Sequence, residues 1–204
     1  MALADTYTFF LGSSKKDWVA YEGTHKTYDD ALQSGSRALN FYAGLAKVVL
    51  TSAEIDFADD ATIAPGSVVA NNITVVATID WSTDRKALVT GLSGPPRTVE
   101  HRKQGKSWKL KAPNGKQYKW EIEEPKRHWR LCNGSDVIAS FDSYYFWKKE
   151  PGYLKLHDIH DDDTRLLILA SWGLVAKSHF EKSTTDNISL GVATAVSGAF
   201  ATNP

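Results

Sequence analysis

Polar and apolar residues alternate in a series of short segments between Ile73 and about residue 156. Segments such as KALVTG, SWKLKA, QYKWEI and DVIASFD carry apolar residues at alternate positions. They recur at intervals of about ten residues, with glycine, proline or asparagine between them, a spacing typical of antiparallel sandwiches and barrels. The pattern therefore predicts a mainly β protein.

The segment GKSWKLKAPNGKQYKWEI, residues 105–122, predicts a hairpin. A two-residue turn at Asn114-Gly115 would mix lysines with aromatic residues on one face, because a slip of one residue reverses the facing of every side chain. A three-residue loop with Gly115 as its left-handed residue instead puts the apolar side chains together. These are Trp108, Leu110, Tyr118 and Trp120. The apolar pattern therefore favours the three-residue loop.

That register leaves the lysines of the hairpin on the opposite face. Lys109 lies opposite Lys119, and Lys111 lies opposite Gln117. Like charges directly opposite one another on a sheet are mildly destabilising, so this arrangement suggests a use for the lysines.

The next hairpin alternates in the same way, with Asn133-Gly134-Ser135 as its expected loop. Five apolar side chains then share one face: Trp129, Leu131, Val137, Ala139 and Phe141. Cys132 falls on the other face. One dry and one wet face is typical of an antiparallel sheet packed on a core.

In the first 50 residues the spacing of apolar residues changes from that of strands to that of a helix. Tyr7–Leu11 and Trp18–Tyr21 resemble short strands, and Thr27 followed by two aspartates resembles a helix start. Apolar residues then recur at roughly helical spacing: Leu32, Leu39, Tyr42 and Leu45. The sequence predicts a helix from about Tyr28 to Val48.

An acidic, turn-rich stretch with Pro65-Gly66 follows and suggests a boundary between an N-terminal extension and the main body of the protein. We expect a single domain over residues 1–204 with three parts. Residues 1–70 would add N-terminal strands and a helix to the barrel, residues 71–182 would form the barrel core, and residues 183–204 would be an apolar tail.

The run Leu166–Ala176 is apolar on all sides, apart from Ser171 and Gly173, and it follows the plausible cap Asp163-Thr164. A helix that is apolar all round is a buried helix. We therefore predict a helix over Arg165–Lys177 inside or against a curved sheet, with a buried strand as the alternative.

Residues from about 73 to 182 resemble a fungal family of uncharacterised tubby-like proteins, whose superfamily includes LURP-one-like proteins and phospholipid scramblases. The resemblance lies in VVATIDW, in KWEI after APNGKQY, in DVIASF and in DTRLLILASWGLVAK. It implies a closed antiparallel barrel threaded by a hydrophobic helix near the C-terminus. The superfamily also includes phosphoinositide binders, so the resemblance implies a tendency to bind anionic lipid.

Bulk composition excludes several classes of protein. The chain has 24 basic and 24 acidic residues, so no overall charge draws it to nucleic acid. Its single cysteine, Cys132, cannot form an intrachain disulfide. We recognise no signal peptide, and the longest apolar run has 11 residues, too few to span a bilayer. We expect a cytoplasmic protein.

The strongest candidate site is a basic run. Between Arg97 and Lys119 there are eight cations and one acid, Glu100. The candidate anion-binding residues are Arg102, Lys103, Lys106, Lys109, Lys111 and Lys119. They could contact an anionic membrane surface or a phosphorylated small molecule. The alternative is a solvated lysine face that only discourages aggregation. Nucleic acid is disfavoured, because the aromatic residues of the hairpin point to the core and cannot stack on bases.

The segment HDIHDDD offers His157 and His160 as metal-ligand candidates, since histidines three apart with carboxylates nearby can bind a divalent ion. An acidic turn that caps the following helix is the favoured interpretation. Cys132 lacks an evident base and is expected to be inert. No cofactor and no catalytic residue is predicted.

The leading hypothesis is a non-enzymatic domain that contacts anionic lipid headgroups, or another anion, through the lysines of its outer face, peripherally at a membrane. One alternative is a small-molecule enzyme with a cavity between the barrel and the N-terminal helix. The polar groups of that cavity would come from HDIHDDD or from the region Asp56–Asp60. Another is a protein-interaction module that forms a homo-oligomer through the C-terminal tail and the aromatics of SYYFWKK.

Overall fold

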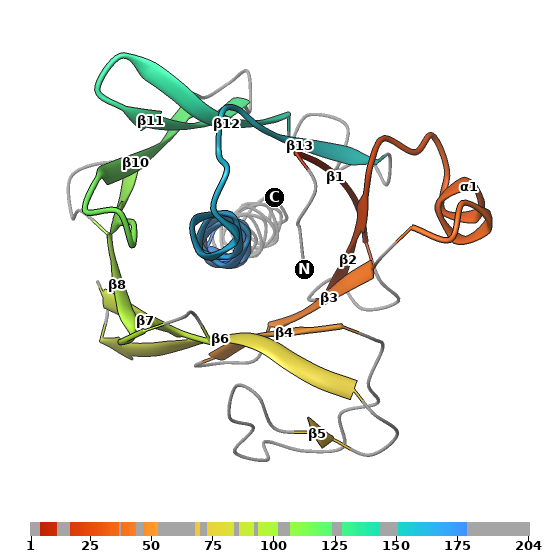
Figure 1. Cartoon of the computed structure of the whole chain (residues 1–204), viewed down its shortest axis with the longest axis horizontal. Coiled ribbons are helices and arrows are strands. Elements are labelled where there is room, and N and C mark those ends of the chain that lie inside the picture. Colours follow the sequence, from red (N-terminus) through yellow and green to blue (C-terminus); the bar gives the residue numbers. More distant parts are fainter. Residues whose placement is uncertain are drawn as a thin grey trace, which may run out of the picture.

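A closed antiparallel barrel surrounds one helix (Figure 1). The computed structural model describes residues 5–11, 17–36, 38–43, 47–52, 68–69, 73–83, 86–91, 94–101, 107–123, 128–142 and 151–178. Over these residues, thirteen strands form one sheet in the order β4-β3-β2-β1-β13-β12-β11-β10-β9-β8-β7-β6-β5, and β4 also pairs with β6. That last pairing closes a ring of twelve strands and leaves β5 outside it. The predicted mainly β barrel is confirmed.

The strands are β1 Thr6–Leu11, β2 Asp17–Glu22, β3 Ala38–Ala43, β4 Lys47–Thr51, β5 Val68–Val69, β6 Ile73–Thr83, β7 Lys86–Thr90, β8 Arg97–His101, β9 Ser107–Lys111, β10 Gln117–Glu123, β11 His128–Asn133, β12 Asp136–Asp142 and β13 Gly152–Leu156. The helices are α1, Tyr28–Gln33, and a helix described over residues 162–178, here called the central helix.

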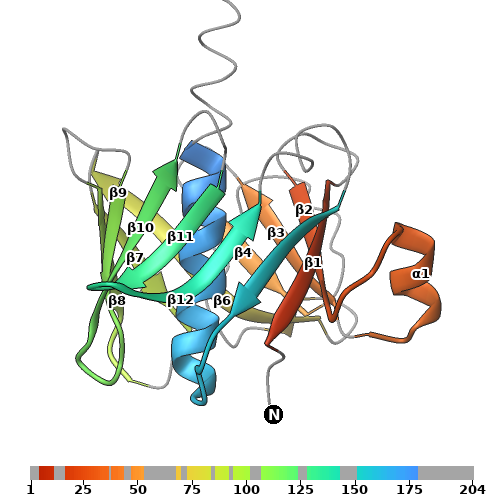
Figure 2. The same cartoon turned by 90° about the horizontal axis from the view of Figure 1, so that it is seen from above.

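The central helix runs through the barrel along its length (Figures 1 and 2). A ring of this many strands is wider than the eight-stranded barrels that side chains alone can fill. A helix about 10 Å across occupies that space and bonds its own backbone groups, which a strand without a neighbour could not do. All residues of Leu166–Ala176 are buried, so the predicted buried helix is confirmed and the strand alternative is wrong.

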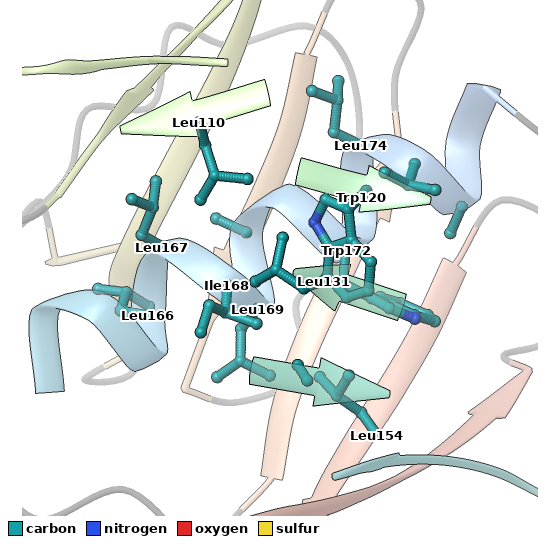
Figure 3. Packing of buried hydrophobic residues seen from close by; sticks show 14 of the residues in the cluster. Leu110, Trp120, Leu131, Leu154, Leu166, Leu167, Ile168, Leu169, Trp172 and Leu174 are labelled. Atoms are coloured by element: carbon teal, nitrogen blue, oxygen red, sulfur yellow. The ribbon is translucent and has the colours of Figure 1, made fainter. Parts of the chain in front are cut away.

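Side chains from the helix and the wall meet in one apolar core. Figure 3 shows Leu167 and Trp172 of the helix among Leu110, Leu131 and Leu154 of the wall. This arrangement explains why the apolar residues of each strand alternate: every second side chain points at the helix.

Trp172 lies at the centre of an aromatic cluster. Its ring centroid is 3.8 Å from that of Phe9, 5.1 Å from Phe141 and 5.7 Å from Phe41. The next residue, Gly173, makes room for this approach, because a Cβ built there would lie 3.1 Å from Cδ1 of Phe41.

Ser171, the polar interruption of the apolar run, is fully satisfied. Its Oγ accepts a hydrogen bond from Nε1 of Trp120 at 2.9 Å and donates one to the carbonyl of Ile168 at 2.9 Å. A buried hydroxyl without partners would be costly, so this pair fixes the rotation of the helix against β10.

The start of the helix is tied to the N-terminus of the chain. Oδ1 of Asp161 accepts from the backbone N–H of Thr164 at 2.7 Å, which is the capping role expected of the HDIHDDD segment. Arg165 donates through Nε to the carbonyl of Ile159 at 2.7 Å and through Nη2 to Asp5 at 2.6 Å. Asp5 in turn accepts, through its carbonyl, from Leu156 at 2.7 Å.

The predicted helix from Tyr28 to Val48 is wrong beyond its first six residues. Its start is confirmed, since Oγ1 of Thr27 accepts from the N–H of Asp30 at 3.1 Å. The helix then stops at Gln33, and Gly35 adopts φ +66°, a left-handed conformation that suits glycine.

Strands β3 and β4 occupy the rest of that predicted helix. Leu39 and Phe41 point into the barrel, a period of two that the spacing of Leu32, Leu39 and Tyr42 concealed. Four strands that precede residue 52 are therefore part of the closed ring. Helix α1 lies outside the wall, where it packs on β1 and β2 (Figure 2).

The first hairpin has the predicted register. Leu110 pairs with Tyr118, and Lys109 pairs with Lys119. Gly115 adopts φ +83°, and its N–H donates to the carbonyl of Ala112 at 2.9 Å. The three-residue loop is therefore confirmed.

The second hairpin differs at its turn. A bulge lies between Leu131, which pairs with Ala139, and Cys132, which pairs with Val137. Val137 is consequently exposed instead of facing the core, while Ile138 packs partly against the core. The remaining inward residues of the hairpin lie as predicted.

The break at Pro65-Gly66, the aromatics of SYYFWKK and the apolar tail after residue 182 lie outside the described ranges. Among the described helices, none is long and apolar enough to cross a membrane.

Replacing Trp172 with alanine should lower the free energy of unfolding by about 3–5 kcal/mol, because the change removes a fully buried indole from the centre of the core. Urea unfolding followed by fluorescence and circular dichroism measures this. Leu32→Ala on α1 is the control, since Leu32 is 53% exposed and its loss should cost about 0.5 kcal/mol or less. Equal costs for the two changes would contradict the helix-filled barrel.

Candidate functional site

Two rows of polar side chains lie on the outer face of β8, β9 and β10. These three neighbouring strands are drawn in yellow-green to green in Figure 2. Glu100, Lys109 and Lys119 form one row, since each pairs with the next across the sheet. Lys111 pairs with Gln117 in the second row, and the same β8–β9 register brings Thr98 beside Lys111. These residues face solvent because Val99, Leu110 and Tyr118, which alternate with them, face the helix.

A hollow of about 340 Å³ opens on this outer face. Its lining residues are Thr98, Glu100, Lys109, Leu110, Lys111 and Gln117. Leu110 is buried, whereas the five polar residues that line the hollow are exposed or partly exposed. The hollow is therefore built by the register of β8–β10, with contributions from both rows.

Two carboxylates of β10, Glu121 and Glu123, neutralise part of the basic surface. Nζ of Lys119 lies 2.7 Å from Oε1 of Glu121, which is two residues further along β10 and on the same face. Arg130 of β11 forms an ion pair with Glu123. The sheet thus brings acids to this face that the run from Arg97 to Lys119 does not contain.

Lys109 and Lys111 differ from these paired cations. Neither makes an ion pair within 4.0 Å in the part of the chain that the structure describes, and both line the hollow. Glu100, the cross-strand neighbour of Lys109, is instead 3.4 Å from Lys86 of β7. Both lysines therefore have hydrogen-bond donors free for a ligand of the hollow.

The predicted anion-binding residues therefore separate into three groups. Lys109 and Lys111 come together in the hollow, and Lys119 lies next to them but is held by Glu121. Arg102, Lys103 and Lys106 lie outside the described residues, between β8 and β9.

Sequence reasoning did not assign Thr98, Glu100 and Gln117 to the site. The signal that could have found Gln117 was already present in the hairpin register, which puts it opposite Lys111. Thr98 and Glu100 join the site through the register between β8 and β9, which the sequence reasoning did not predict.

The metal-ligand candidates are not assembled into a site. Nε2 of His157 lies 3.3 Å from Oγ of Ser140, and the Asp161 carboxylate caps the central helix. Within the described ranges, no group of three or more His, Cys, Asp or Glu residues could hold a metal ion. This part of the chain therefore favours the acidic turn over a metal site at His157 and His160.

Cys132 of β11 pairs with Lys119 of β10 and so lies next to the lysines of the hairpin. Burial raises the pKa of its thiol, and the nearby Glu121 carboxylate raises it further, while Arg130 and Lys119 act in the opposite direction. A raised pKa keeps the thiol protonated at neutral pH, so it is a poor nucleophile.

The space between the barrel and α1, where the enzyme hypothesis placed a cavity, is occupied by side chains. Phe10, Val19, Tyr21 and Ala31 pack there in a second small apolar cluster. Tyr28 of α1 extends it, with its ring 5.6 Å from that of Phe10. The Asp56–Asp60 stretch of the same hypothesis lies outside the described residues.

Comparison with known families matches residues 49–180 to a family of unknown function, DUF6593. The chain belongs to DUF6593. The match to DUF6593 covers the end of β4, all of β5–β13 and the central helix, and so it includes all the described residues that line the hollow. No curated protein and no solved structure matches the chain.

Cys132 should react slowly with Ellman's reagent at pH 8 in the folded chain, because burial both covers the sulfur and lowers its thiolate fraction. The rate should rise with pH and increase further when urea unfolds the chain. Absorbance at 412 nm follows the reaction. A folded-state rate equal to the unfolded rate would show that the thiol is neither covered nor perturbed.

Proposed function

We propose that this chain is a non-enzymatic binding domain that holds an anionic group in the hollow on the outer face of β8–β10. The group would be the headgroup of an anionic lipid or a soluble phosphorylated molecule. In this proposal the domain works in the cytoplasm and lies peripherally on the membrane when its ligand is a lipid.

The observation that carries the proposal is the pairing state of the lysines. Other cations of this face, Lys86, Lys119 and Arg130, have carboxylate partners, whereas Lys109 and Lys111 have none in the described part of the chain. These two unneutralised ammonium groups, two residues apart on β9, offer six N–H donors to a single anion. A lysine face that served only solubility would not need this separation.

The size of the hollow supports a small ligand. A volume of about 340 Å³ lies at the lower end of the range of about 300–1,000 Å³ typical of ligand sites. That suits a single headgroup or phosphorylated metabolite. The resemblance to tubby-like proteins, which include phosphoinositide binders, points to the same chemistry.

The partial neutralisation by Glu121 and Glu123 supports a local site over a broad electrostatic surface. Exposed charges separated by more than about 8 Å are largely screened at physiological salt. The remaining attraction then comes mainly from the cations that the ligand touches. Binding should therefore depend on Lys109 and Lys111 more than on the total number of lysines.

The double substitution Lys109→Gln, Lys111→Gln should weaken binding to anionic vesicles about thirtyfold, from about 1 kcal/mol for each basic residue at the membrane surface. Co-sedimentation with phosphatidylserine, phosphoinositide and neutral phosphatidylcholine vesicles, at low and physiological salt, measures the loss. The chain should bind the anionic vesicles only, and more weakly as salt rises.

Lys155→Gln is the matched control, since Lys155 is exposed on β13 and does not line the hollow. It should bind like the unchanged chain. An equal loss in the control and in the double variant would indicate diffuse attraction and overturn the assignment of the hollow. Absence of binding to any anionic vesicle or soluble phosphate ester would overturn the proposed function itself.

A further inference from the structure

Glu100 is a carboxylate within a hollow assigned to an anion. It lines the same space as Lys109 and Lys111, and its Cα pairs with that of Lys109 across the β8–β9 ladder. Its position bears on which anionic ligand the hollow prefers, a question that rests on the proposed function.

A carboxylate at this position opposes the binding of a simple anion. Among the described residues, two lysines and one glutamate are the charged residues that line the hollow, so a dianion placed there meets two attractive charges and one repulsive charge from them. Glutamine would keep the shape and remove the repulsion. A hollow suited to inorganic phosphate or to a plain phosphate ester has no use for this glutamate.

Glu100 nevertheless retains the capacity to bind a donor. One of its oxygens, Oε1, lies 3.4 Å from Nζ of Lys86, and both side chains are more than half exposed. An ionised carboxylate has two oxygens and about four acceptor positions, so one exposed partner leaves room for another. An exposed pair of this kind is weak and gives way readily to a competing cation.

The remaining polar groups of the hollow suit a ligand of mixed charge. Thr98 and Gln117 can each donate or accept a hydrogen bond, and they lie in the row next to Glu100 and Lys109. The hollow therefore offers partners for a negative group, at the lysines, and for a positive group, at Glu100, of one ligand.

We propose that Glu100 makes the hollow selective for a phosphate ester that also carries an ammonium group, the arrangement found in phosphoethanolamine and phosphoserine. The phosphate is held by Lys109 and Lys111, and the ammonium by the free oxygen of Glu100. The same chemistry occurs in soluble metabolites and in the headgroups of aminophospholipids.

The first test compares two soluble probes that differ in one group. Phosphoethanolamine and ethyl phosphate share the phosphate ester, and only the former has an ammonium. Charge alone predicts tighter binding of ethyl phosphate, which carries the larger net negative charge. The proposal predicts tighter binding of phosphoethanolamine, by about threefold, the size expected of one exposed ion pair. Titrations monitored by the backbone amide resonances of Thr98, Lys109 and Lys111 measure both affinities at the site.

Glu100→Gln should abolish that preference and strengthen the binding of ethyl phosphate. Glu123→Gln is the matched control, because it makes the same change in charge on β10, two strands away from β8, without lining the hollow. The control should retain the preference for phosphoethanolamine. Unchanged amide spectra away from the substitutions show that both variants are folded.

Vesicles distinguish the source of the ligand. Phosphatidylserine and phosphatidylglycerol each carry one net negative charge, and only the former has an ammonium. A preference for phosphatidylserine vesicles that Glu100→Gln removes identifies a lipid headgroup. A preference seen with the soluble probes alone identifies a free metabolite. Both results support the selectivity.

Ethyl phosphate that binds as tightly as phosphoethanolamine, or more tightly, in the unchanged chain would overturn this inference. A preference that survives Glu100→Gln would overturn the role of Glu100. In either case anions would still bind at Lys109 and Lys111, so the proposed function would stand. Loss of all anion binding would instead remove the proposed function together with the inference.

Discussion

Burial of the central helix is the constraint on which the rest of the structure depends. A helix that is apolar on all sides must be surrounded, and a closed ring of strands surrounds it without leaving an unpaired sheet edge. Each strand then has one face that must be apolar. The facing of every other side chain follows, because neighbouring residues of a strand point in opposite directions.

The outer surface inherits its pattern from that core. Trp108, Leu110, Tyr118 and Trp120 pack toward the helix, so Lys109, Lys111 and Lys119 must lie together outside. The ladder then decides which of them keep a free charge. Glu121 lies close enough to hold Lys119, while Lys109 and Lys111 line the hollow without such a partner in the described chain. The candidate site is thus a product of strand register.

Local signals predicted the parts of the fold that local physics determines. Gly115 and the alternation around it fixed the first hairpin, and the apolar run from Leu166 fixed the buried helix. Residues 34–48 were mispredicted because short apolar sequences fit a period of 3.6 or of 2 about equally well. The closure of the ring, which decides between them, is a contact between distant segments, β4 and β6.

The charge pairing of the site could be predicted only in part, because it too depends on contacts between strands. The cations between Arg97 and Lys119 lie close together in the sequence, but Glu121, the acidic partner of Lys119, lies just beyond that run, and Glu100 within the run is paired with Lys86 of β7. Glu100 seemed the lone acid of a basic run, and only the ladder shows that it lies beside Lys109 within the hollow.

Protection of individual lysines from chemical modification tests the central claim most directly. Reductive methylation of the full chain, with and without phosphatidylserine vesicles, can be measured at each lysine by mass spectrometry. The account predicts that the vesicles protect Lys109 and Lys111 and leave Lys155 unprotected. Equal protection of all three lysines, or protection of Lys155 alone, would contradict it.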